Sequence, residues 1–483
     1  MGAEQHSNYV NGQWVVGTTA WSKNINPSDL NDVVGEYAQA GEAQTQEAIA
    51  AARAAAPAWG GFNVQARADA LDKIGAEILA RKDELGKLLS REEGKTLAEG
   101  VGEVVRAGNI FKFYAGEVLR RTGELVPSVR PGVDVEVTRE PLGVIGIITP
   151  WNFPAAIPAW KVAPALAYGN CVVFKPADLV PGSAWALAEI ISRAGLPAGA
   201  FNLVMGRGSV VGEALVNDTR VDAISFTGSV DTGRKIAQKA AARLAKFQLE
   251  MGGKNPLVVL DDADLKTAVE SAVNGAYFST GQRCTASSRL IVTHGIHGKF
   301  VDALTERLKN LVVDDALKAG TQIGPVVDKN QLNQDLFYIE EGKKEGAKLA
   351  FGGRLLKREK EGFYLEPALF TETSNAMRIN REEVFGPVAA VVAAKDYDEA
   401  LQLANDTPFG LSAGIVTSSL KHAAHFRRNS QAGMVMVNLP TAGVDYHVPF
   451  GGRKGSSYGP REQGRYAVEF FTTVKTSYVA ALA

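Results

Sequence analysis

The sequence predicts an α/β protein with two domains built on mostly parallel sheets and an arm of strands that leaves the body. Three observations carry this prediction. Helix-forming residues dominate the first 121 positions, short apolar runs alternate with helical segments from 144 to 260, and a second alternating set begins near 265. Such alternation is typical of parallel sheets, because a helix crosses the sheet before each new strand joins it.

The elements of the first part follow from composition and pattern. Segments rich in Ala, Leu, Glu and Lys predict helices at 46–58, 67–91 and 97–121, because these residues have high helix propensity. After Pro141, apolar runs predict strands at 144–148, 171–174, 201–205, 223–226 and 257–260. The segments between them predict helices at 160–167, 183–194, 210–216 and 232–245. This β-α-β series predicts a doubly wound, Rossmann-like sheet.

The remaining segments predict a second α/β domain and an arm. A strand is predicted at 290–292, a helix at 298–311 and further strands at 388–392 and 433–437. Two segments, 124–140 and 469–479, have strand patterns but fit neither core. Because an unpaired strand edge seeks a partner, we expect both segments to leave the body and pair elsewhere.

Composition favours an enzyme that acts on a small molecule. The chain has 483 residues, enough for two or three cores, and its 52 Lys and Arg against 53 Asp and Glu leave no basic excess to hold nucleic acid or an anionic membrane. The first residues lack a signal-peptide pattern, and prolines interrupt the apolar stretch at 144–160. We therefore expect a cytoplasmic protein with no nucleic-acid or membrane partner.

Cys284 is the candidate nucleophile. The other cysteine, Cys171, lies in an apolar run and is predicted to be a buried strand residue. The chain also offers Glu250, before a Gly-Gly pair, and Asn152, in a proline-flanked turn. Alone, Glu250 is typical of a surface carboxylate and Asn152 of a turn. Because a thiolate attacks carbonyl carbon and a carboxylate activates water, the three together predict covalent catalysis through a thioester.

Two glycine patterns, at 206–212 and 226–233, each follow a predicted strand and open a helix. The N–H groups at a helix N-terminus attract phosphate. Neither pattern matches the dinucleotide fingerprint, so each alone is an ordinary tight turn. Because the two patterns follow successive strands, a nucleotide site and a pair of ordinary turns are equally good interpretations.

Motifs along essentially the whole chain resemble those of the NAD(P)-dependent aldehyde dehydrogenase superfamily. They are residues 149–154, 174–178, 226–229, 249–254, 281–285, 382–387 and 449–452. The resemblance implies the aldehyde dehydrogenase fold, with a Rossmann-like NAD-binding domain (1–121 and 142–252), an α/β catalytic domain (253–465) and a β-strand oligomerisation arm (122–141 and 466–483). The runs 438–450 and 455–462 more narrowly resemble bacterial α-ketoglutaric semialdehyde (2,5-dioxopentanoate) dehydrogenases, which belong to pentose and sugar-acid catabolism.

The resemblance implies a role for each of the three chemical residues. Cys284 attacks the aldehyde carbon, and the side-chain amide of Asn152 holds the oxyanion together with the Cys284 backbone N–H. Collapse of the thiohemiacetal passes hydride to the nicotinamide. Glu250 then deprotonates the water that hydrolyses the thioester.

The resemblance also implies an NAD site. Lys175 and Asp178 hold the adenosine ribose, Ser229 the pyrophosphate and Glu383 the nicotinamide ribose. By motif position the cofactor residues are Ile148, Thr149, Trp151, Lys175, Ala177, Asp178, Gly208, Phe226, Gly228, Ser229, Thr232, Gln331, Glu383 and Phe385. Many NAD-using relatives carry Glu where this chain has Asp178, which reaches a ribose hydroxyl less surely but still repels a 2′-phosphate. We expect NAD to be preferred, with some use of NADP.

Substrate residues are less legible in the sequence. Arg283 flanks the nucleophile, and Arg106 falls where relatives place a tunnel residue. Either guanidinium could donate two parallel hydrogen bonds to a substrate carboxylate. Arg283 could instead lower the pKa of the thiol, and either arginine is also explained as a solvated or structural side chain. Apolar walls are expected from Phe153, Ile157, Trp160 and Phe450, although such residues are more often plain core.

Functions of different classes remain open. The leading one is oxidation of α-ketoglutaric semialdehyde to α-ketoglutarate, with succinic semialdehyde or another semialdehyde or aliphatic aldehyde as the alternative substrate. A CoA-acylating relative would usually lack a glutamate at the position of Glu250, and a non-catalytic homologue would be expected to have lost Cys284, Glu250 or Asn152.

Two further expectations concern metals and assembly. Histidine pairs occur at 294/297 and 422/425, but neither has a plausible third ligand, so no metal site is expected. The resemblance implies that the arm segments extend a neighbouring subunit's sheet, giving a dimer or a dimer of dimers.

Overall fold

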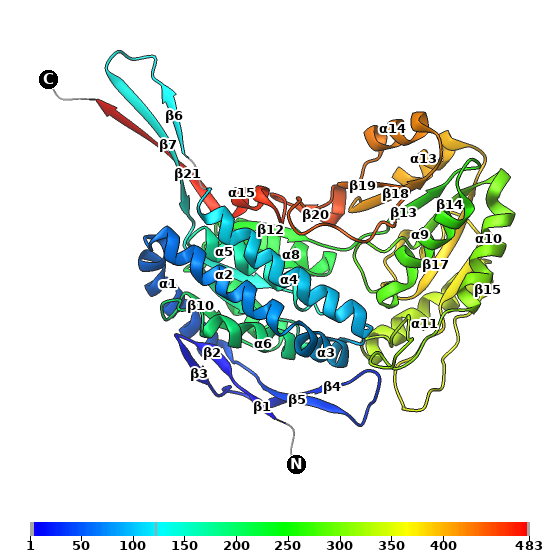
Figure 1. Cartoon of the computed structure of the whole chain (residues 1–483), viewed down its shortest axis with the longest axis horizontal. Helices are drawn as coiled ribbons and strands as arrows, with labels where there is room; N and C mark the ends of the chain where they lie inside the picture. Colours follow the sequence, from blue (N-terminus) through cyan, green and yellow to red (C-terminus); the bar gives the residue numbers. More distant parts are fainter. Residues whose placement is uncertain (1–3, 121–122, 481–483) are drawn as a thin grey trace.

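The structure is a computed structural model that describes residues 4–120 and 123–480. Residues 1–3, 121–122 and 481–483, at which some of the predicted helix, domain and arm segments begin or end, lie outside the described residues. Two large sheets form two bodies, and an arm of three strands projects from the first (Figure 1). Helices and mostly parallel sheets confirm the predicted α/β class.

An 8-stranded sheet forms the centre of the first body. Its order is β20 (Ser457–Tyr458), β12 (Lys246–Glu250), β11 (Ala223–Thr227), β8 (Val144–Ile148), β9 (Cys171–Lys175), β10 (Phe201–Leu203), β2 (Asn8–Val10) and β3 (Gln13–Val15). The strands from β12 to β10 run parallel, whereas β20 and β2 join antiparallel at either side. Strands β8, β9 and β11 are buried throughout, as in a sheet covered on both faces. Short 3₁₀ turns (Lys454–Ser456 and Arg465–Ala467) flank β20.

The helices of the first body differ from the prediction at one break. They are α1 (Glu42–Gly60), α2 (Val64–Ala80), α3 (Lys82–Glu93), α4 (Leu97–Val118), α5 (Ala156–Ala167), α6 (Pro181–Ser192), a π-helical turn (Gly208–Gly212), α7 (Glu213–Asn217) and α8 (Val230–Ala242). The single helix predicted at 67–91 is wrong, because the backbone leaves the helical region at Arg81. The Arg81 guanidinium there pairs locally with Glu84 and, far away in the sequence, with Glu189 on α6. Helix propensity does not report the second of these contacts.

A small sheet precedes the first helix and has no counterpart in the sequence analysis. Its order is β1 (Gln5–His6), β5 (Val33–Ala38) and β4 (Trp21–Ile25). The strands β1 and β4 are short or mostly polar, so they lack the apolar runs that identified the central strands. The Asn24 side chain donates to Glu92 Oε2 at 2.7 Å, which ties this sheet to α3.

The second body is built on a 7-stranded sheet. Its order is β15 (Lys348–Phe351), β16 (Ala368–Thr373), β17 (Val388–Ala394), β14 (Arg289–Thr293), β13 (Pro256–Val259), β18 (Ser412–Val416) and β19 (Met434–Val437), with β15 antiparallel at one edge. The helical elements are α9 (Leu265–Tyr277), a 3₁₀ turn (Phe278–Gly281), α10 (His294–Lys309), α11 (Lys329–Lys344), α12 (Arg378–Arg381), α13 (Tyr397–Asn405) and α14 (Leu420–Asn429). The strands predicted in this part are confirmed as β14, β17 and β19. The strand predicted at 257–260 as part of the first series is β13, which pairs with β14 and β18 and so belongs to this sheet. Among the described residues, no helix is long and apolar enough to cross a membrane.

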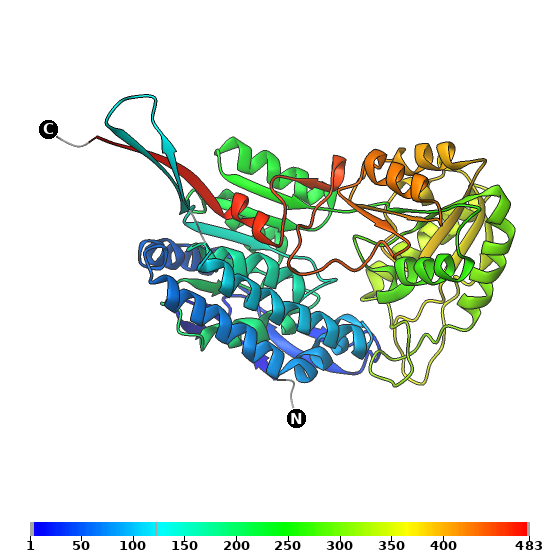
Figure 2. The ribbon, with the colours of Figure 1, turned by 45° about the horizontal axis from the view of Figure 1, so that its top comes forward.

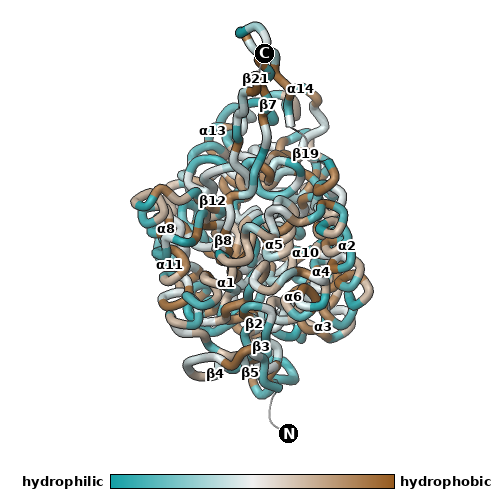
Figure 3. Tube along the Cα trace, turned by 90° about the vertical axis from the view of Figure 1, so that its left-hand side faces the viewer, coloured by the Kyte–Doolittle hydropathy of each residue, from teal (hydrophilic) through white to brown (hydrophobic). Residues whose placement is uncertain are grey.

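The arm is a small antiparallel sheet in the order β21 (Thr472–Ala480), β7 (Val133–Pro141) and β6 (Glu124–Pro127). It stands clear of both bodies in two views (Figures 1 and 2), and hydrophobic stretches lie among hydrophilic ones along it (Figure 3). Its exposed apolar side chains include Leu125, Val129 and Tyr478. The strand predicted from 469 begins later, because 468–471 form α15 (Val468–Phe471), whose two phenylalanines are buried in the first core.

The turn after α8 predicts a stabilising substitution. Leu244 is 93% exposed and has a φ of +58°. Its N–H donates to Ala241 O while the Ala245 N–H donates to Ala240 O, the Schellman pattern in which glycine is preferred. Leu244→Gly should stabilise the first body by about 1 kcal/mol, because a Cβ crowds this backbone conformation. Calorimetry should show the unfolding midpoint about 2–4 °C higher.

Leu244→Ala is the matched control, since it removes the exposed side chain but keeps the Cβ. Its midpoint should stay near that of the unchanged protein. Equal midpoints for the glycine and alanine variants would contradict the argument from backbone strain.

Candidate active site

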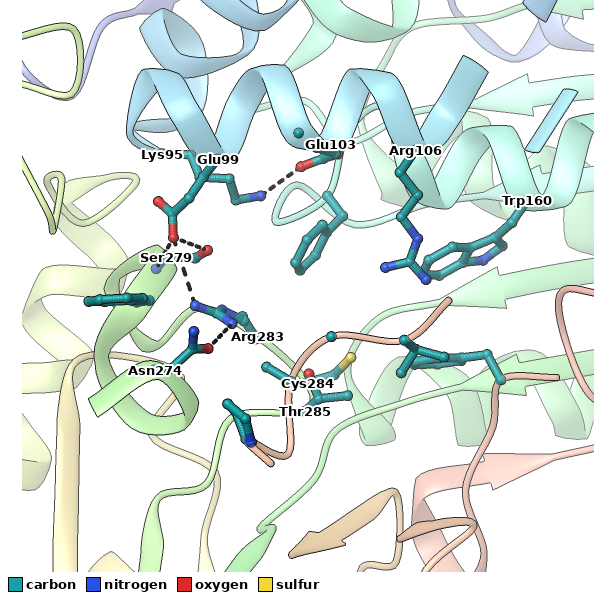
Figure 4. Close-up of a pocket in the computed structure, with 18 residues that line it drawn as sticks. Lys95, Glu99, Glu103, Arg106, Trp160, Asn274, Ser279, Arg283, Cys284 and Thr285 are labelled. Carbon is teal, nitrogen blue, oxygen red and sulfur yellow. Dashed lines mark hydrogen bonds and ion pairs between the residues drawn. The ribbon is translucent and has the colours of Figure 1, made fainter. Parts of the chain in front are cut away.

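Two cavities, each lined by residues of both bodies, meet at Cys284. The first cavity, of about 420 Å³, lies among α4, α5, the 3₁₀ turn after α9 and the segment 440–450 (Figure 4). The second cavity, of about 230 Å³, lies among the turn 150–152, the start of α8, α11 and the segment 383–385. Among the described residues, Cys284 alone lines both cavities. Groups held in the two cavities would therefore meet at this residue.

The turn before Cys284 uses backbone conformations that side chains rarely adopt. Ser279 has a φ of +51° and Gly281 a φ of +67°. The strain at Ser279 costs about 1–2 kcal/mol, and two hydrogen bonds offset it, because its N–H and O–H donate to Glu99 Oε1 at 2.8 and 3.0 Å. A Cβ added to Gly281 would lie 2.1 Å from Gly386 O. Glycine thus lets the turn lie directly against the segment 382–387.

The thiol of Cys284 is held in its neutral form. Its pKa is raised to about 12, first by burial and then by the negative charges of Glu383 and Glu250. Arg283 was one residue that could lower this pKa, but its guanidinium lies 3.8 Å from Glu99, and the pKa of the thiol remains above its usual value. Since the thiolate is the nucleophile, the free protein presents a weakly reactive cysteine at neutral pH.

A buried ion pair positions Asn152. Lys95 Nζ donates to Glu103 Oε2 at 2.7 Å and to the backbone oxygen of Asn152 at 2.6 Å, and the two side chains are 1% and 2% exposed (Figure 4). The other Glu103 oxygen accepts from two backbone N–H groups at the start of α5. The side-chain amide of Asn152 donates to Gln282 O at 3.0 Å. The amide is therefore fixed next to the segment that carries the cysteine.

Glu250 ends β12 and is 2% exposed. Burial raises the pKa of its carboxyl well above the usual range, and the charge of Glu462 raises it further. A hydrogen bond from Ser457 Oγ, at 2.5 Å, acts in the opposite direction. Glu462 in turn pairs with the buried Lys161. Glu250 thus belongs to a buried group of coupled charges, and it does not line either of the two cavities.

The second cavity gathers part of the predicted cofactor set. The residues that line it are Trp151, Gly228, Ser229, Gln331, Glu383 and Phe385. The rings of Trp151 and Phe385 meet edge to face with centroids 5.4 Å apart. Glu383 Oε1 accepts from the Gly253 N–H at 2.8 Å, and burial raises the pKa of Glu383 to about 7. Ser229 caps the N-terminus of α8.

The other predicted cofactor residues do not line this cavity. They are Ile148, Thr149, Lys175, Ala177, Asp178, Gly208, Phe226 and Thr232. Ile148, Lys175 and Phe226 lie at or next to the carboxyl ends of β8, β9 and β11, the edge at which open parallel sheets bind ligands. Lys175 Nζ donates to Asp178 Oδ1 at 3.1 Å, which ties the two together.

The first cavity gathers most of the predicted substrate residues. Those that line it are Arg106, Phe153, Trp160, Arg283 and Phe450. Ile157 lines the second cavity instead, because it lies in the first turn of α5, near Asn152. Its expected place beside the substrate stays a prediction, since Cys284 also lines this second cavity.

The two arginines are partly without hydrogen-bond partners. The Arg106 guanidinium lies 5.3 Å from the centre of the Trp160 ring and donates to Gln463 Oε1 at 3.1 Å. Arg283 donates to Asn274 Oδ1 at 3.5 Å. The Nε atoms of both arginines are buried and have no hydrogen-bond partner among the described residues. Figure 4 shows both side chains in the cavity that Cys284 lines.

Sequence reasoning missed several charged residues of the first cavity. Lys95, Glu99 and Glu103 all line it, together with the predicted Arg106. One signal was present, since positions 99, 103 and 106 are spaced by four and three residues and lie on one face of a helix. Lys95 lies in the turn before α4 and carried no such signal.

The histidine pairs do not form a metal site in the described parts of the chain. Among residues 4–120 and 123–480, no group of three or more His, Cys, Asp or Glu side chains could hold a metal ion. His422 stacks on Tyr397 with ring centroids 4.4 Å apart, and His425 Nδ1 lies 2.8 Å from the Tyr397 hydroxyl. This second pair is thus engaged by a tyrosine.

Comparison with known proteins identifies the family. Residues 14–477 match the model of the aldehyde dehydrogenase family. The chain belongs to this family. An α-ketoglutaric semialdehyde dehydrogenase of Bacillus subtilis is 45% identical over 98% of this chain and 97% of its own length. A 2,5-dioxopentanoate dehydrogenase of Saccharolobus solfataricus is 41% identical over 96% and 98%. Both relatives agree with the narrower resemblance of the sequence.

Solved structures confirm the aldehyde dehydrogenase fold. A betaine aldehyde dehydrogenase of Staphylococcus aureus in complex with NAD+ superposes with a TM-score of 0.96 at 34% identity, over 98% of this chain and 94% of that one. An NADP-dependent enzyme of E. coli gives a TM-score of 0.95 at 34% identity, over 99% and 98%. A betaine aldehyde dehydrogenase in complex with NAD+ and an NADP-dependent enzyme thus share this fold.

The charges around Cys284 predict how its reactivity changes. Glu383→Gln removes the carboxylate that, after burial, raises the pKa of the thiol most. The pKa should therefore fall, and the thiolate fraction at pH 8 should rise. Alkylation of the free protein by iodoacetamide, followed by intact-mass spectrometry at pH 8, should be several-fold faster in the variant.

Glu340→Gln is the control, because Glu340 is exposed on α11 and pairs with Lys343. It should leave the alkylation rate unchanged. If Glu383→Gln alkylates no faster than this control, the charge of Glu383 does not set the reactivity of Cys284.

Proposed function

We propose that the protein oxidises an aldehyde to a carboxylic acid with NAD, through a thioester on Cys284. The observation that carries the proposal is the position of Cys284 on the wall shared by two cavities. A sulfur in that position can bind a substrate carbon from the first cavity and present it to an oxidant in the second. Asn152 lines the second cavity beside it.

Each step has a residue of this chain. The Cys284 sulfur adds to the aldehyde carbon and its proton leaves to solvent. The oxyanion is held by the Cys284 backbone N–H and by Asn152 Nδ2, which carries two hydrogens and uses one on Gln282 O. Removal of one such donor costs about 10²–10³ in rate. After oxidation, water attacks the thioester carbon, Glu250 takes its proton, and the C–S bond breaks to release the thiolate.

The second cavity fits a dinucleotide. The N-terminus of α8 opens at Ser229 on its wall, where backbone N–H groups favour a phosphate. Trp151 and Phe385 offer apolar faces, and the carboxylate of Glu383 offers an acceptor for ribose hydroxyls. When bound, NAD would supply the oxidant, because its nicotinamide accepts a hydride, which is two electrons and one proton, from the substrate carbon. Asp178 is expected to disfavour a 2′-phosphate, so NAD should be preferred, with some use of NADP.

The first cavity supports a substrate that carries a carboxylate. Arg106 forms no ion pair among the described residues, and Arg283 forms one at 3.8 Å. A carboxylate would satisfy the buried guanidinium groups, since Arg binds carboxylates through parallel hydrogen bonds. Together with the relatives named above, this supports α-ketoglutaric semialdehyde as substrate and α-ketoglutarate as product, in pentose or sugar-acid catabolism. Succinic semialdehyde or another aldehyde is the alternative. Transfer of the acyl group to CoA is disfavoured, because Glu250 is available to activate water.

The bodies and the arm receive roles in the same proposal. The first body (1–121 and 142–252) holds the cofactor, and the second (253–465) brings the nucleophile, while β20 from the second segment completes the first sheet. The arm segments (122–141 and 466–483) pair with another subunit to give a dimer or a dimer of dimers, because β21 leaves an unpaired edge in the chain by itself. We place the enzyme in the cytoplasm, with a small-molecule aldehyde as its partner.

Aldehyde oxidation tests the proposal directly. Reduction of NAD should be followed by absorbance with α-ketoglutaric semialdehyde, succinic semialdehyde, glutaraldehyde and aliphatic aldehydes. The semialdehydes that carry a carboxylate should give the highest kcat/KM, and Cys284→Ala should abolish turnover. Turnover that persists without Cys284 would refute the thioester mechanism.

The arginines are tested with the same assay. Arg106→Met or Arg283→Met should raise KM for the carboxylated semialdehydes by about tenfold or more, because a hydrogen bond to a charged group contributes about 1.5–3 kcal/mol. KM for aliphatic aldehydes should change little. Arg354→Met, an exposed arginine paired with Glu366, is the control. An equal loss with every aldehyde would argue for a structural role.

The arm is tested by truncation. The deletion should begin at Thr473, because Phe470 and Phe471 are buried in the first core and must stay. Deletion of 473–483 removes most of β21 and should give a smaller species in sedimentation velocity, or aggregates formed through the exposed edge of β7. An intact oligomer after this deletion would exclude the arm from assembly.

A further inference from the structure

The carboxyl group of Glu250 lies against β20 and the glycines that precede it. Glu250 and Ser457 are directly paired in the antiparallel register of β12 and β20, so their side chains project from the same face of the sheet. Ser457 Oγ donates to Glu250 Oε2 at 2.5 Å and accepts from the Gly452 N–H at 2.6 Å. Because the Gly452 N–H occupies the hydroxyl oxygen, the hydroxyl hydrogen points to the carboxylate.

The second oxygen of Glu250 occupies space that depends on a glycine. Gly451 has a φ of +149°, and a Cβ added there would lie 2.8 Å from Glu250 Oε1. Both carboxyl oxygens are therefore held on the side of β20 and the segment 451–452. Glu250 does not line either cavity at Cys284. To deprotonate a water at the thioester, its side chain must leave this place.

We propose that Ser457 is a positioning residue that holds Glu250 in a resting place beside β20, from which the carboxylate is released to activate the hydrolytic water. The inference rests on the proposed function, because it presupposes an acyl group on Cys284. Ser457 touches neither cavity and acts through Glu250 alone. Its hydroxyl therefore acts chiefly on thioester hydrolysis, and it reaches thioester formation only through the charge of Glu250 on the Cys284 thiol.

The hydrogen bond sets both the population and the charge of the resting carboxylate. A donor to an ionised carboxylate stabilises the charged form, so Ser457 lowers the pKa of Glu250 in the resting place. It also holds part of the ionised Glu250 away from the water. Removal of the hydroxyl should thus raise the fraction of Glu250 near the thioester and move the onset of hydrolysis to higher pH.

Other charged groups also act on Glu250 and must stay constant in the test. Glu462 raises the pKa of Glu250, whereas Lys161 on α5 and Arg461 lower it. The Cys284 thiol and Glu250 also interact, since the charge of Glu250 raises the pKa of the thiol. A substitution at Ser457 leaves all four of these groups in the chain.

Rapid mixing separates the two half-reactions. Protein in excess is mixed with α-ketoglutaric semialdehyde and NAD, quenched in acid at successive times, and analysed by intact-mass spectrometry for the acyl group on Cys284. Repeated between pH 5 and 10, this gives the rate of acylation and the rate of hydrolysis. In Ser457→Ala, hydrolysis on the high-pH plateau should be up to about tenfold faster, with its midpoint higher by up to about one pH unit.

The controls distinguish a resting place from general damage. In Ser457→Ala the rate of acylation should change much less than the rate of hydrolysis, because Ser457 acts on Cys284 only through the charge of Glu250. Ser457→Thr, which keeps the hydroxyl, should restore the hydrolysis rate and midpoint of the unchanged protein. A plateau that is unchanged or slower in Ser457→Ala, or a midpoint that does not move, overturns the inference. If the unchanged protein forms no acyl group on Cys284, the proposed function itself fails, a result that is separate from any effect at Ser457.

Discussion

The buried ion pair of Lys95 and Glu103 holds together the segments from which the site is assembled. One end binds the backbone oxygen of Asn152, and the other accepts from the first N–H groups of α5. A pair this deeply buried contributes little net stability when intact, but loss of one partner leaves an unpaired charge that costs about 3–5 kcal/mol. The turn that carries Asn152 can therefore occupy one position or leave the protein strongly destabilised. The fixed side-chain amide of Asn152, through its hydrogen bond to Gln282 O, also positions the segment that carries Cys284.

Burial gives the ionisable groups of the site their properties. The pKa values of Cys284, Glu250 and Glu383 are all raised, with burial as the largest cause for each. Inside a protein the neutral form of an ionisable group has the lower free energy, because the charged form loses its hydration there. In the free protein the ionisable groups of the site are therefore protonated or partly protonated. A charged or polar ligand would favour their ionised, active forms. A reactive thiol kept neutral until then is protected from oxidation and alkylation.

The strands that consist of apolar runs could be predicted from the sequence. The elements that form only through contacts with distant segments could not. Strands such as β8 and β9 are buried on both faces and have continuous apolar sequences. The edge strand β20 has two residues and exists because β12 is there to pair with it. In the same way, motifs predicted roles for Cys284 and Asn152, whereas Lys95 has no local sequence pattern and is defined by its contact with a segment more than fifty residues away.

The path of the chain has a consequence for the order in which the protein can fold. The first core includes Phe470 and Phe471, and the first sheet is closed at one side by β20, although every other strand of that sheet precedes residue 251. During synthesis, residues 251–456 must emerge after β12 before these last pieces arrive. Until then β12 is an unpaired edge strand of the first body, and unpaired strand edges are prone to aggregation. The first sheet and the first core are therefore complete only after β20 and α15 have been synthesised, which is later than the last strand of the second sheet.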